Sequence, residues 1–277
     1  MDEVTGRFPR IGWLVLALGT LYVLVPIAAA VKFSLWQGHA GFSFSAYTDV
    51  LRDPEFRHTL WFSVQLAIET TALTMILMVP TVYWVHLRLP RLRPAVEMIT
   101  VLPLVTPPIV LVVGLFDVFR GRAPTWFIDS PKFLVAAYVI ICLPFVYRAL
   151  DAGIRAVDIH TLTDAAQSLG ASRSRTLFRV ILPNLSGAVA ISCLLCFVIV
   201  LGEYTIASID LYETFPVYIQ FIGTSQAYEA VALSIISVLM TFAVALVFVV
   251  LARVGRPGSK QSRAAAFIPA SSAPTNP

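Results

Sequence analysis

Three acidic residues, Glu69, Asp117 and Glu203, lie inside long apolar stretches of this sequence or near their ends. Ionisable side chains in such stretches are costly and usually functional. No basic residue occurs at comparable depth, so the three carboxylates indicate a path that favours a cation. Two of them have plainer explanations. Asp117 also fits a hydrated residue at a membrane surface, and Glu69 fits a carboxylate that is hydrogen-bonded to neighbouring threonine hydroxyls.

Glu203 is the strongest of these candidates because it follows Gly202 and precedes Tyr204 within an apolar stretch. We expect Glu203 and Tyr204 to contact a substrate or a gate. A second candidate gate is Thr106–Ile109, where Pro107 and Pro108 must break the backbone hydrogen-bond ladder. Such breaks are tolerated where they are buried in protein or line a cavity. A simple structural kink remains the alternative.

No group of residues suggests a metal site or a catalytic centre. The three cysteines, Cys142, Cys193 and Cys196, lie in apolar runs and are expected to be small buried hydrophobic residues. The four histidines are scattered at span ends and in loops, which argues against a membrane-bound enzyme. The sequence also lacks a G-x-x-x-x-G-K-[ST] motif, so we expect no ATP binding by this chain.

The elements that carry these residues are membrane spans. Of the 277 residues, 58% are hydrophobic and only 13% are charged, with a mean hydropathy of +0.81. A helix needs about 20 apolar residues to cross a bilayer core. The sequence therefore predicts an all-α, polytopic membrane protein with six transmembrane helices, at Ile11–Val31, Thr59–Tyr83, Ala95–Phe119, Phe133–Leu150, Gly187–Ile209 and Ala230–Ala252.

The placement of basic residues predicts the orientation. With both termini in the cytoplasm, 14 of the 20 Lys and Arg residues fall on the inner side and 6 on the outer side. We therefore expect a cytoplasmic N-terminus at residues 1–10, a membrane domain at 11–255 and a disordered cytoplasmic tail at 256–277. The first span also has small residues that suit a cleavable signal peptide, but its length favours a retained anchor.

One inner segment, about residues 151–186, is too long for a turn and too polar for a span. It predicts two short helices that are separated by Gly170, which can adopt positive φ. Thr161 or Thr163 is expected to cap the first helix, with Asp164 in its first turn, and Ser172 to cap the second. Pro183 is expected to end the second helix.

The surface of this segment suits docking into a partner's groove. Its first helix presents small residues, and its second carries an apolar stripe of Leu177, Phe178, Ile181 and Leu182 beside three arginines. The alternative is an amphipathic linker that lies on the lipid surface.

The spacing within this segment resembles the cytoplasmic loop of type I ABC importer permeases. That loop reads Glu-Ala-Ala, three residues, Gly, nine residues, Ile-x-Leu-Pro. Here Asp164, Ala165 and Ala166 match its opening, Gly170 its glycine, and Val180, Leu182 and Pro183 its close, with Asp and Val as conservative departures. The resemblance covers about residues 11–255, and we call the segment 151–186 the coupling loop.

The resemblance implies partners and a mechanism. In that family the coupling loop, here with Phe178 as its aromatic anchor, seats on a separate ATPase subunit. Two such subunits use ATP and Mg, and no cofactor is implied for this chain. A second, paralogous permease subunit and an extracytoplasmic solute-binding protein complete the transporter, which is implied to lie in the bacterial plasma membrane and to work by alternating access. A stand-alone secondary carrier is the rival class.

Weaker motifs resemble the polyamine (spermidine/putrescine) subgroup, namely Leu102–Val110, Leu143–Arg148 and Gly202–Ala207. Relatives for ferric iron, thiamine and phosphonates belong to the same subgroup and are the alternatives. The outer segment Asp210–Glu229 is aromatic and lacks Lys and Arg. It fits a docking surface for the solute-binding protein, an aromatic belt at the membrane interface, or both.

Overall fold

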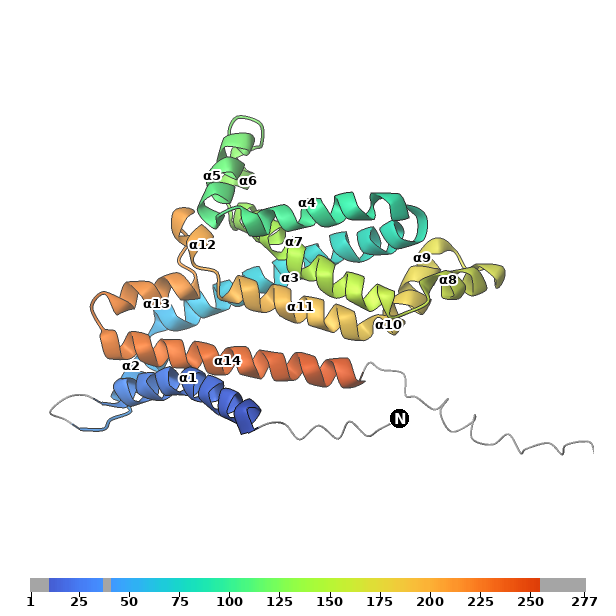
Figure 1. Ribbon diagram of the computed structural model, residues 1–277. Coiled ribbons are helices and arrows are strands. Elements are labelled where there is room, and N and C mark those ends of the chain that lie inside the picture. The colour runs from blue at the N-terminus through green and yellow to red at the C-terminus, as the bar shows by residue number, and fades with distance from the viewer. Residues whose placement is uncertain (1–9, 37–40, 255–277) are drawn as a thin grey trace, which may run out of the picture.

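The computed structural model describes residues 10–36 and 41–254, and within them it is helical (Figure 1). One isolated bridge joins Trp36 to Phe42, and these described residues contain no strand. The all-α prediction is confirmed. The predicted tail at 256–277 and most of the N-terminal segment 1–10 lie outside the described residues.

The long helices correspond to the predicted spans. Five candidate spans are long and apolar enough to cross a membrane within the described chain, or six when one bent pair is counted as a span. Four of them are single helices and the fifth is formed by two; they are α1 (Arg10–Leu35), α3 (Pro54–Arg88), α7 (Pro131–Arg155), α14 (Ala227–Val254), and α11 (Ser186–Leu201) with α12 (Thr205–Ile209).

The bent pair occupies the predicted span Ala95–Phe119, and the predicted break at Pro107 and Pro108 is confirmed. A 3₁₀ turn (η2, Pro90–Leu92) leads into α4 (Arg93–Val105), and α5 (Pro108–Phe119) leaves it at 108°. A residue before proline is pushed into an extended conformation. Thr106 and Pro107 both precede a proline, and their ψ angles are 124° and 138°.

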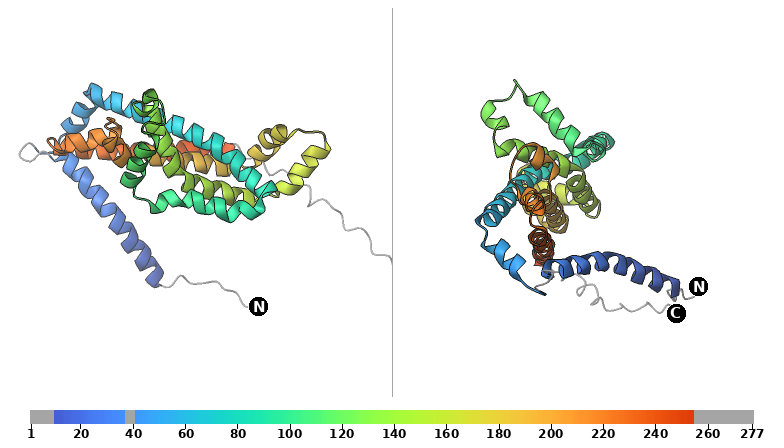
Figure 2. Two further views of the ribbon diagram at one scale, coloured as in Figure 1. Left: turned by 90° about the horizontal axis from the view of Figure 1, so that it is seen from above. Right: turned by 90° about the vertical axis from the view of Figure 1, so that its left-hand side faces the viewer.

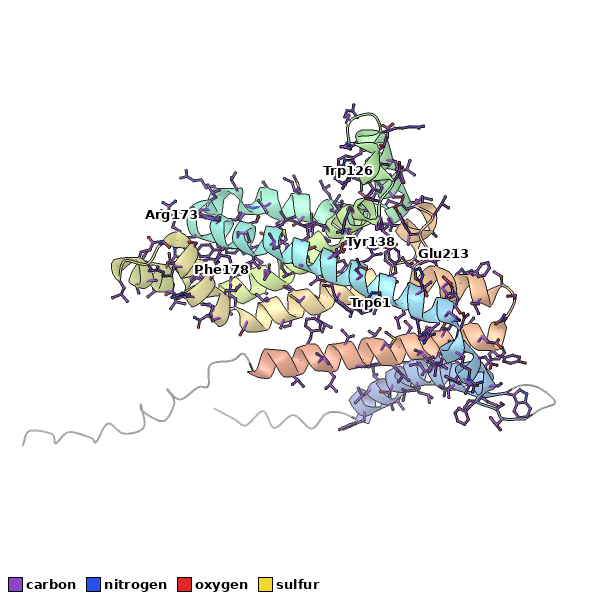
Figure 3. The ribbon with its side chains drawn as sticks, turned by 180° about the vertical axis from the view of Figure 1, so that it is seen from behind. Trp61, Trp126, Tyr138, Arg173, Phe178 and Glu213 are labelled. Atoms are coloured by element: carbon purple, nitrogen blue, oxygen red, sulfur yellow. The ribbon has the colours of Figure 1, made fainter. Side chains whose placement is uncertain are left out.

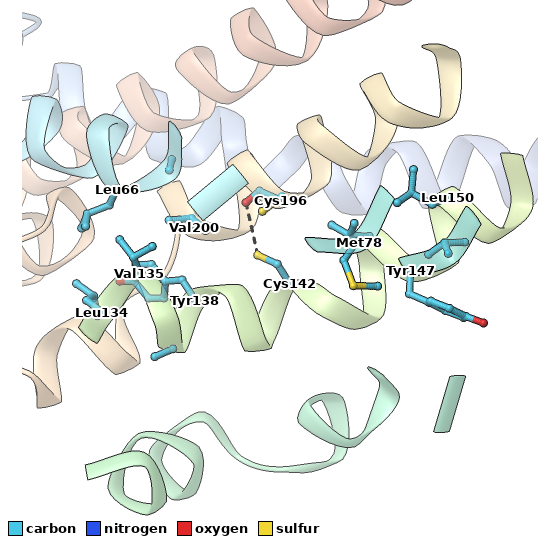
Figure 4. Packing of buried hydrophobic residues seen from close by; sticks show 14 of the residues in the cluster. Leu66, Met78, Leu134, Val135, Tyr138, Cys142, Tyr147, Leu150, Cys196 and Val200 are labelled. Carbon is cyan, nitrogen blue, oxygen red and sulfur yellow. Dashed lines mark hydrogen bonds between the residues drawn. The ribbon is translucent and has the colours of Figure 1, made fainter. Parts of the chain in front are cut away.

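The core of the bundle consists of α3, α7 and α11, which lie side by side (Figure 1). Where α7 meets α11, a Cβ atom at Gly153 would overlap the Cβ atom of Ala188. Cys142 and Cys196 are fully buried between these helices, and the Cys142 thiol donates to the backbone carbonyl of Cys196 (Figure 4). The prediction of buried cysteines is confirmed for these two, whereas Cys193 is half-buried.

The shorter elements gather at the two ends of the bundle (Figure 1). One end carries α2 (Ser45–Arg52), α6 (Thr125–Ile128), α12 and α13 (Phe215–Gly223). The opposite end carries α8 (Ile159–Ser168), α9 (Arg173–Thr176), a π-helical turn η3 (Leu177–Ile181) and α10 (Leu182–Asn184). In a second view α1 leaves the bundle at an angle (Figure 2), and its main neighbour is α14.

The predicted aromatic outer segment is in part a packed helix. Phe215 and Tyr218 of α13 are buried, and the backbone N–H of Phe215 donates to Ser63 Oγ at 2.8 Å. The Tyr218 hydroxyl donates to the carboxylate of Asp53. Burial, and then this hydrogen bond, raise the pKa of Tyr218. Phe221, in contrast, is 70% exposed, so it stays available to a partner or to lipid while the two buried rings hold the helix in place.

Candidate coupling surface and translocation path

The first helix of the coupling loop, α8, begins at Ile159 and is capped by Asp158. The Asp158 carboxylate accepts the Thr161 hydroxyl at 2.6 Å and the Thr161 backbone N–H at 3.1 Å. These hydrogen bonds hold the pKa of the Asp158 carboxyl below its usual range. The predicted threonine cap is wrong because the helix starts earlier than expected, which also places Asp164 in the second turn rather than the first.

The turn after α8 depends on Gly170, whose φ is +80°. The Gly170 N–H donates to the Gln167 carbonyl at 2.9 Å, and the Ala171 N–H donates to the Ala166 carbonyl at 3.0 Å. This pair of bonds is the Schellman motif, in which glycine supplies the left-handed residue. Ser172 then caps α9, where its Oγ atom accepts the Arg175 N–H at 3.4 Å. The predictions for Gly170 and Ser172 are confirmed.

Pro183 does not end the second helix, as was expected from the sequence. The chain winds through η3 and α10 and enters α11 after a turn at Leu185. Proline removes one backbone hydrogen bond and its ring crowds the preceding turn. The wide π-helical turn just before Pro183 accommodates the ring, so the helical path continues into the membrane span.

The predicted apolar stripe divides between two faces. Leu177 and Ile181 are buried in the core, and Leu182 is half-buried. Phe178, which is labelled at the α8–α10 end in Figure 3, is in contrast 63% exposed. Leu169, at the end of α8, is 90% exposed.

The residues of the motif's opening also face in different directions. Asp164 and Ala165 are exposed, whereas Ala166 is buried against its own segment. The coupling loop therefore projects from the bundle with an exposed aromatic and an exposed aliphatic side chain. An exposed apolar surface of this kind is typical of a site that docks into a partner's groove, and a plain connecting loop would not need it.

Two contacts fasten the coupling loop to α3. The hydroxyls of Tyr83 and Thr163 lie 3.2 Å apart, and both residues are 2% exposed. The guanidinium carbon of Arg173, the first residue of α9, lies 5.5 Å from the ring centre of Trp84. Thus α8 is held to Tyr83 of α3 by a buried hydrogen bond, and α9 is held to Trp84 of α3 by a cation–π contact.

A buried ionic cluster lies beside these contacts. The Asp151 carboxylate of α7 lies 2.9 Å from His86 Nε2, 3.1 Å from Arg93 Nη2 and 2.6 Å from Arg155 Nη2. The cluster joins α3, α4 and α7 at the α8–α10 end. Sequence reasoning missed it: the arginines were counted only for orientation, and Asp151 was assigned to the coupling loop. The sequence did contain a signal for this cluster, because an acid, Asp151, occurs together with basic residues at the ends of several predicted spans.

Glu69, the first of the intramembrane acids, is paired rather than free. Its carboxylate accepts a bond from Lys132 Nζ at 2.7 Å and another from the side-chain amide of Gln65 at 3.1 Å. The expectation that threonine hydroxyls satisfy Glu69 is wrong, as is the expectation that no basic residue reaches this depth. Lys132 begins α7 and extends to α3, so Glu69 contributes no uncompensated charge.

Glu203 lies in the break between α11 and α12. Its carboxylate accepts the Ile206 N–H at 2.9 Å and 3.0 Å, and the Ala207 N–H at 3.3 Å. A carboxylate on the free N–H groups of a helix start is favourable. Tyr204 is exposed in the same break. The structure thus brings Glu203 and Tyr204 to one interruption of the fifth span, and Glu203 has a structural role whatever else it binds.

Asp117 and Thr106 lie on the α4–α5 pair. Asp117 is exposed on α5, without an ion pair or hydrogen bond among residues 10–36 and 41–254, and it borders a shallow hollow of about 470 Å³ with Ile109, Val113 and Gly114. The Thr106 hydroxyl donates to the Leu102 carbonyl at 3.1 Å, at the break that Pro107 introduces. No hydrogen bond or ion pair in the described chain joins Glu69, Asp117 and Glu203 to one another.

These features define a class: a helical membrane protein of five or six spans, with a helical hairpin that projects at one end. Residues 79–257 match the family described as "Binding-protein-dependent transport system inner membrane component". The match covers more than half of the chain, which therefore belongs to this family. It is a permease component of an ABC transporter and a multi-pass membrane protein, and the resemblance drawn from the coupling loop is confirmed.

Individual proteins are similar over most of their length. The spermidine/putrescine transport system permease protein PotB of Haemophilus influenzae is 25% identical over 236 residues, which cover 76% of this chain and 80% of that protein. The permease protein PotC of the Escherichia coli spermidine/putrescine system is 26% identical over 257 residues, which cover 87% and 94%.

A solved structure has the same fold. The crystal structure of a bacterial ABC transporter involved in the import of the acidic polysaccharide alginate contains a chain that superimposes with a TM-score of 0.67, at 20% identity. The superposition covers 91% of this chain and 98% of that one. The permease fold predicted from the sequence is thereby confirmed.

Proposed function

We propose that this chain forms part of the membrane pathway of an ATP-driven importer for a polyamine of the spermidine/putrescine class. The observation that carries the ATP-driven part is the projecting coupling loop, with Gly170 in its left-handed turn and Phe178 exposed. A stand-alone carrier would have no use for an exposed aromatic side chain on a segment that is fastened to the spans. The similarity to PotB and PotC supports the substrate class.

The proposal includes the rest of the transporter. Two ATPase subunits on separate chains hold ATP and Mg and receive the coupling loop. A second permease chain, paralogous to this one, completes the pathway, and an extracytoplasmic solute-binding protein delivers the substrate to the end that carries α2, α12 and α13. Both termini are on the cytoplasmic side, where α8–α10 project from the bundle.

Reconstitution tests this function directly. The chain is co-expressed with its neighbouring permease, ATPase and solute-binding protein, and the complex is placed in liposomes with ATP on the ATPase side. We expect uptake of radiolabelled spermidine or putrescine only when ATP and the loaded solute-binding protein are both present. Uptake by this chain alone, without ATPase or ATP, would refute the proposal in favour of a secondary carrier.

Replacing Glu203 with glutamine is expected to weaken uptake of a cationic substrate about tenfold, which corresponds to about 1.4 kcal/mol. Glutamine keeps one carbonyl oxygen for the Ile206 N–H, removes the negative charge and replaces the second acceptor oxygen with an amide NH2 group. The measurement is the dependence of the uptake rate on substrate concentration in the reconstituted complex.

Two further variants isolate the charge at position 203. Glu203→Ala removes the helix cap as well as the charge, so it should also lower the stability of the protein. Glu229→Gln, which changes an acid in the first turn of α14, should transport normally. An unchanged rate and affinity in Glu203→Gln would end the argument for an acidic path.

A further inference from the structure

One turn of α3 contacts both helices at the start of the coupling loop, α8 and α9, and also the span α7 that leads into them. Tyr83 contacts α8 through Thr163, and Trp84 contacts α9 through Arg173. His86, two residues on, contacts Asp151 on α7, only a few residues before α7 gives way to the loop. Three side chains from four consecutive residues thus reach three different elements.

These contacts differ in strength and accessibility. The hydroxyl pair of Tyr83 and Thr163 is shielded from water, where an unmatched polar group would be costly. The His86 ring is fixed from both sides, because Nδ1 donates to the Val82 carbonyl at 2.9 Å while Nε2 faces Asp151. The turn therefore cannot move away from α8 or α7 without leaving buried polar groups unpaired.

The rest of α3 is suited to transmit a movement of this turn to the core of the bundle. The whole helix is 35 residues long, and the part that precedes the turn packs through Leu66, Met78 and Val82 into the core formed with α7 and α11. Pro80, which has no N–H, lies one turn before Tyr83 and marks the point where bending costs least. Because Met78 and Val82, on either side of Pro80, both pack into the core, a push on the turn is passed to α7 and α11 rather than absorbed by a bend at Pro80.

We propose that the turn Tyr83–His86 of α3 is the relay that passes movement of the coupling loop to the membrane spans, with Tyr83 and Thr163 as its positioning residues. The proposal rests on the ATP-driven function above and names the route that this function takes inside the chain. The exposed face of the loop meets the ATPase, and its buried face holds α3.

The test removes the hydroxyl contact with almost no change in volume. Tyr83→Phe, Thr163→Val and the double variant are reconstituted with the full complex, and both ATP hydrolysis stimulated by the loaded solute-binding protein and substrate uptake are measured. We expect each single variant to import about threefold to tenfold less substrate per ATP hydrolysed, with membrane insertion unchanged. The double variant should be no worse than the single variants, because both remove one shared contact.

Thr241→Val is the matched control for Thr163→Val. Its hydroxyl donates to the Ser237 carbonyl at 2.9 Å within α14, in a contact that involves neither α3 nor the coupling loop, so its loss should leave the ratio of uptake to hydrolysis unchanged. If Tyr83→Phe fails to assemble, Thr163→Val removes the same contact from the other partner and decides the question.

The outcomes separate the two proposals. A wild-type complex that shows neither stimulated hydrolysis nor ATP-dependent uptake refutes the proposed function. A working wild type whose Tyr83 and Thr163 variants keep a normal ratio refutes the relay alone, as do effects that add in the double variant.

Discussion

A valine at position 170 should reduce uptake to less than one tenth of the wild-type rate while the protein still inserts into the membrane. Gly170 has a φ of +80°, where a residue with a Cβ pays roughly 1–2 kcal/mol and a β-branched residue pays more. No atom lies within 4 Å of an added Cβ, so the isolated chain has room for it. The damage should come from a distorted turn and from bulk on the surface that meets the ATPase. Uptake per inserted molecule is the measurement.

Two controls separate strain from docking. Gly121 has a φ of +75° and equally open space around its Cβ position, but it lies in the loop between α5 and α6. Gly121→Val carries the same backbone cost and should leave uptake nearly normal. Gly170→Asn tolerates the left-handed conformation and adds only bulk. Normal uptake by both Gly170→Asn and Gly170→Val would contradict a docking role for this turn.

Removing the Asp151 carboxylate should have the largest effect on stability. Asp151→Ala leaves Arg93 without its counter-charge and His86 without its partner at a largely buried site, and breaking such a pair costs about 3–5 kcal/mol. For a chain of this size the melting temperature of the purified protein should fall by on the order of 10 °C. The amount of protein in the membrane should fall with it.

Arg155→Ala is the matched comparison for that variant. The Arg155 side chain is 55% exposed, so solvent weakens its pair with Asp151 even though the two atoms lie 2.6 Å apart. Its loss should cost less than about 1 kcal/mol. If Asp151→Ala melts with the wild type, the cluster is not a structural element and the expectation fails.

Local signals in the sequence predicted local structure well. Gly170, Ser172 and the broken helix at Pro107 were all predictable, because each depends on a few neighbouring residues and on the backbone chemistry of glycine, serine and proline. The 108° angle between α4 and α5 was not predictable, since proline fixes where a helix breaks and the surrounding packing fixes how far it turns.

Contacts between distant parts of the chain were beyond sequence reasoning. Lys132 reaches Glu69 across 63 residues, and Tyr83 reaches Thr163 across 80. The stripe of Leu177 and Phe178 failed for a different reason. It assigned adjacent residues to one face, whereas Leu177 and Ile181, four residues apart, pack inward and Phe178 is exposed on another side of the helix.

The position of α1 has a consequence for how the protein is made. Among the described spans α1 is made before the others, and none of its apolar stretch is buried within the described residues. Its main neighbour, α14, ends at Val254 and is the last span to be synthesised. During translation α1 must therefore wait in the bilayer, surrounded by lipid or by membrane chaperones. Native packing on that side of the bundle can close only after α14 has also been made.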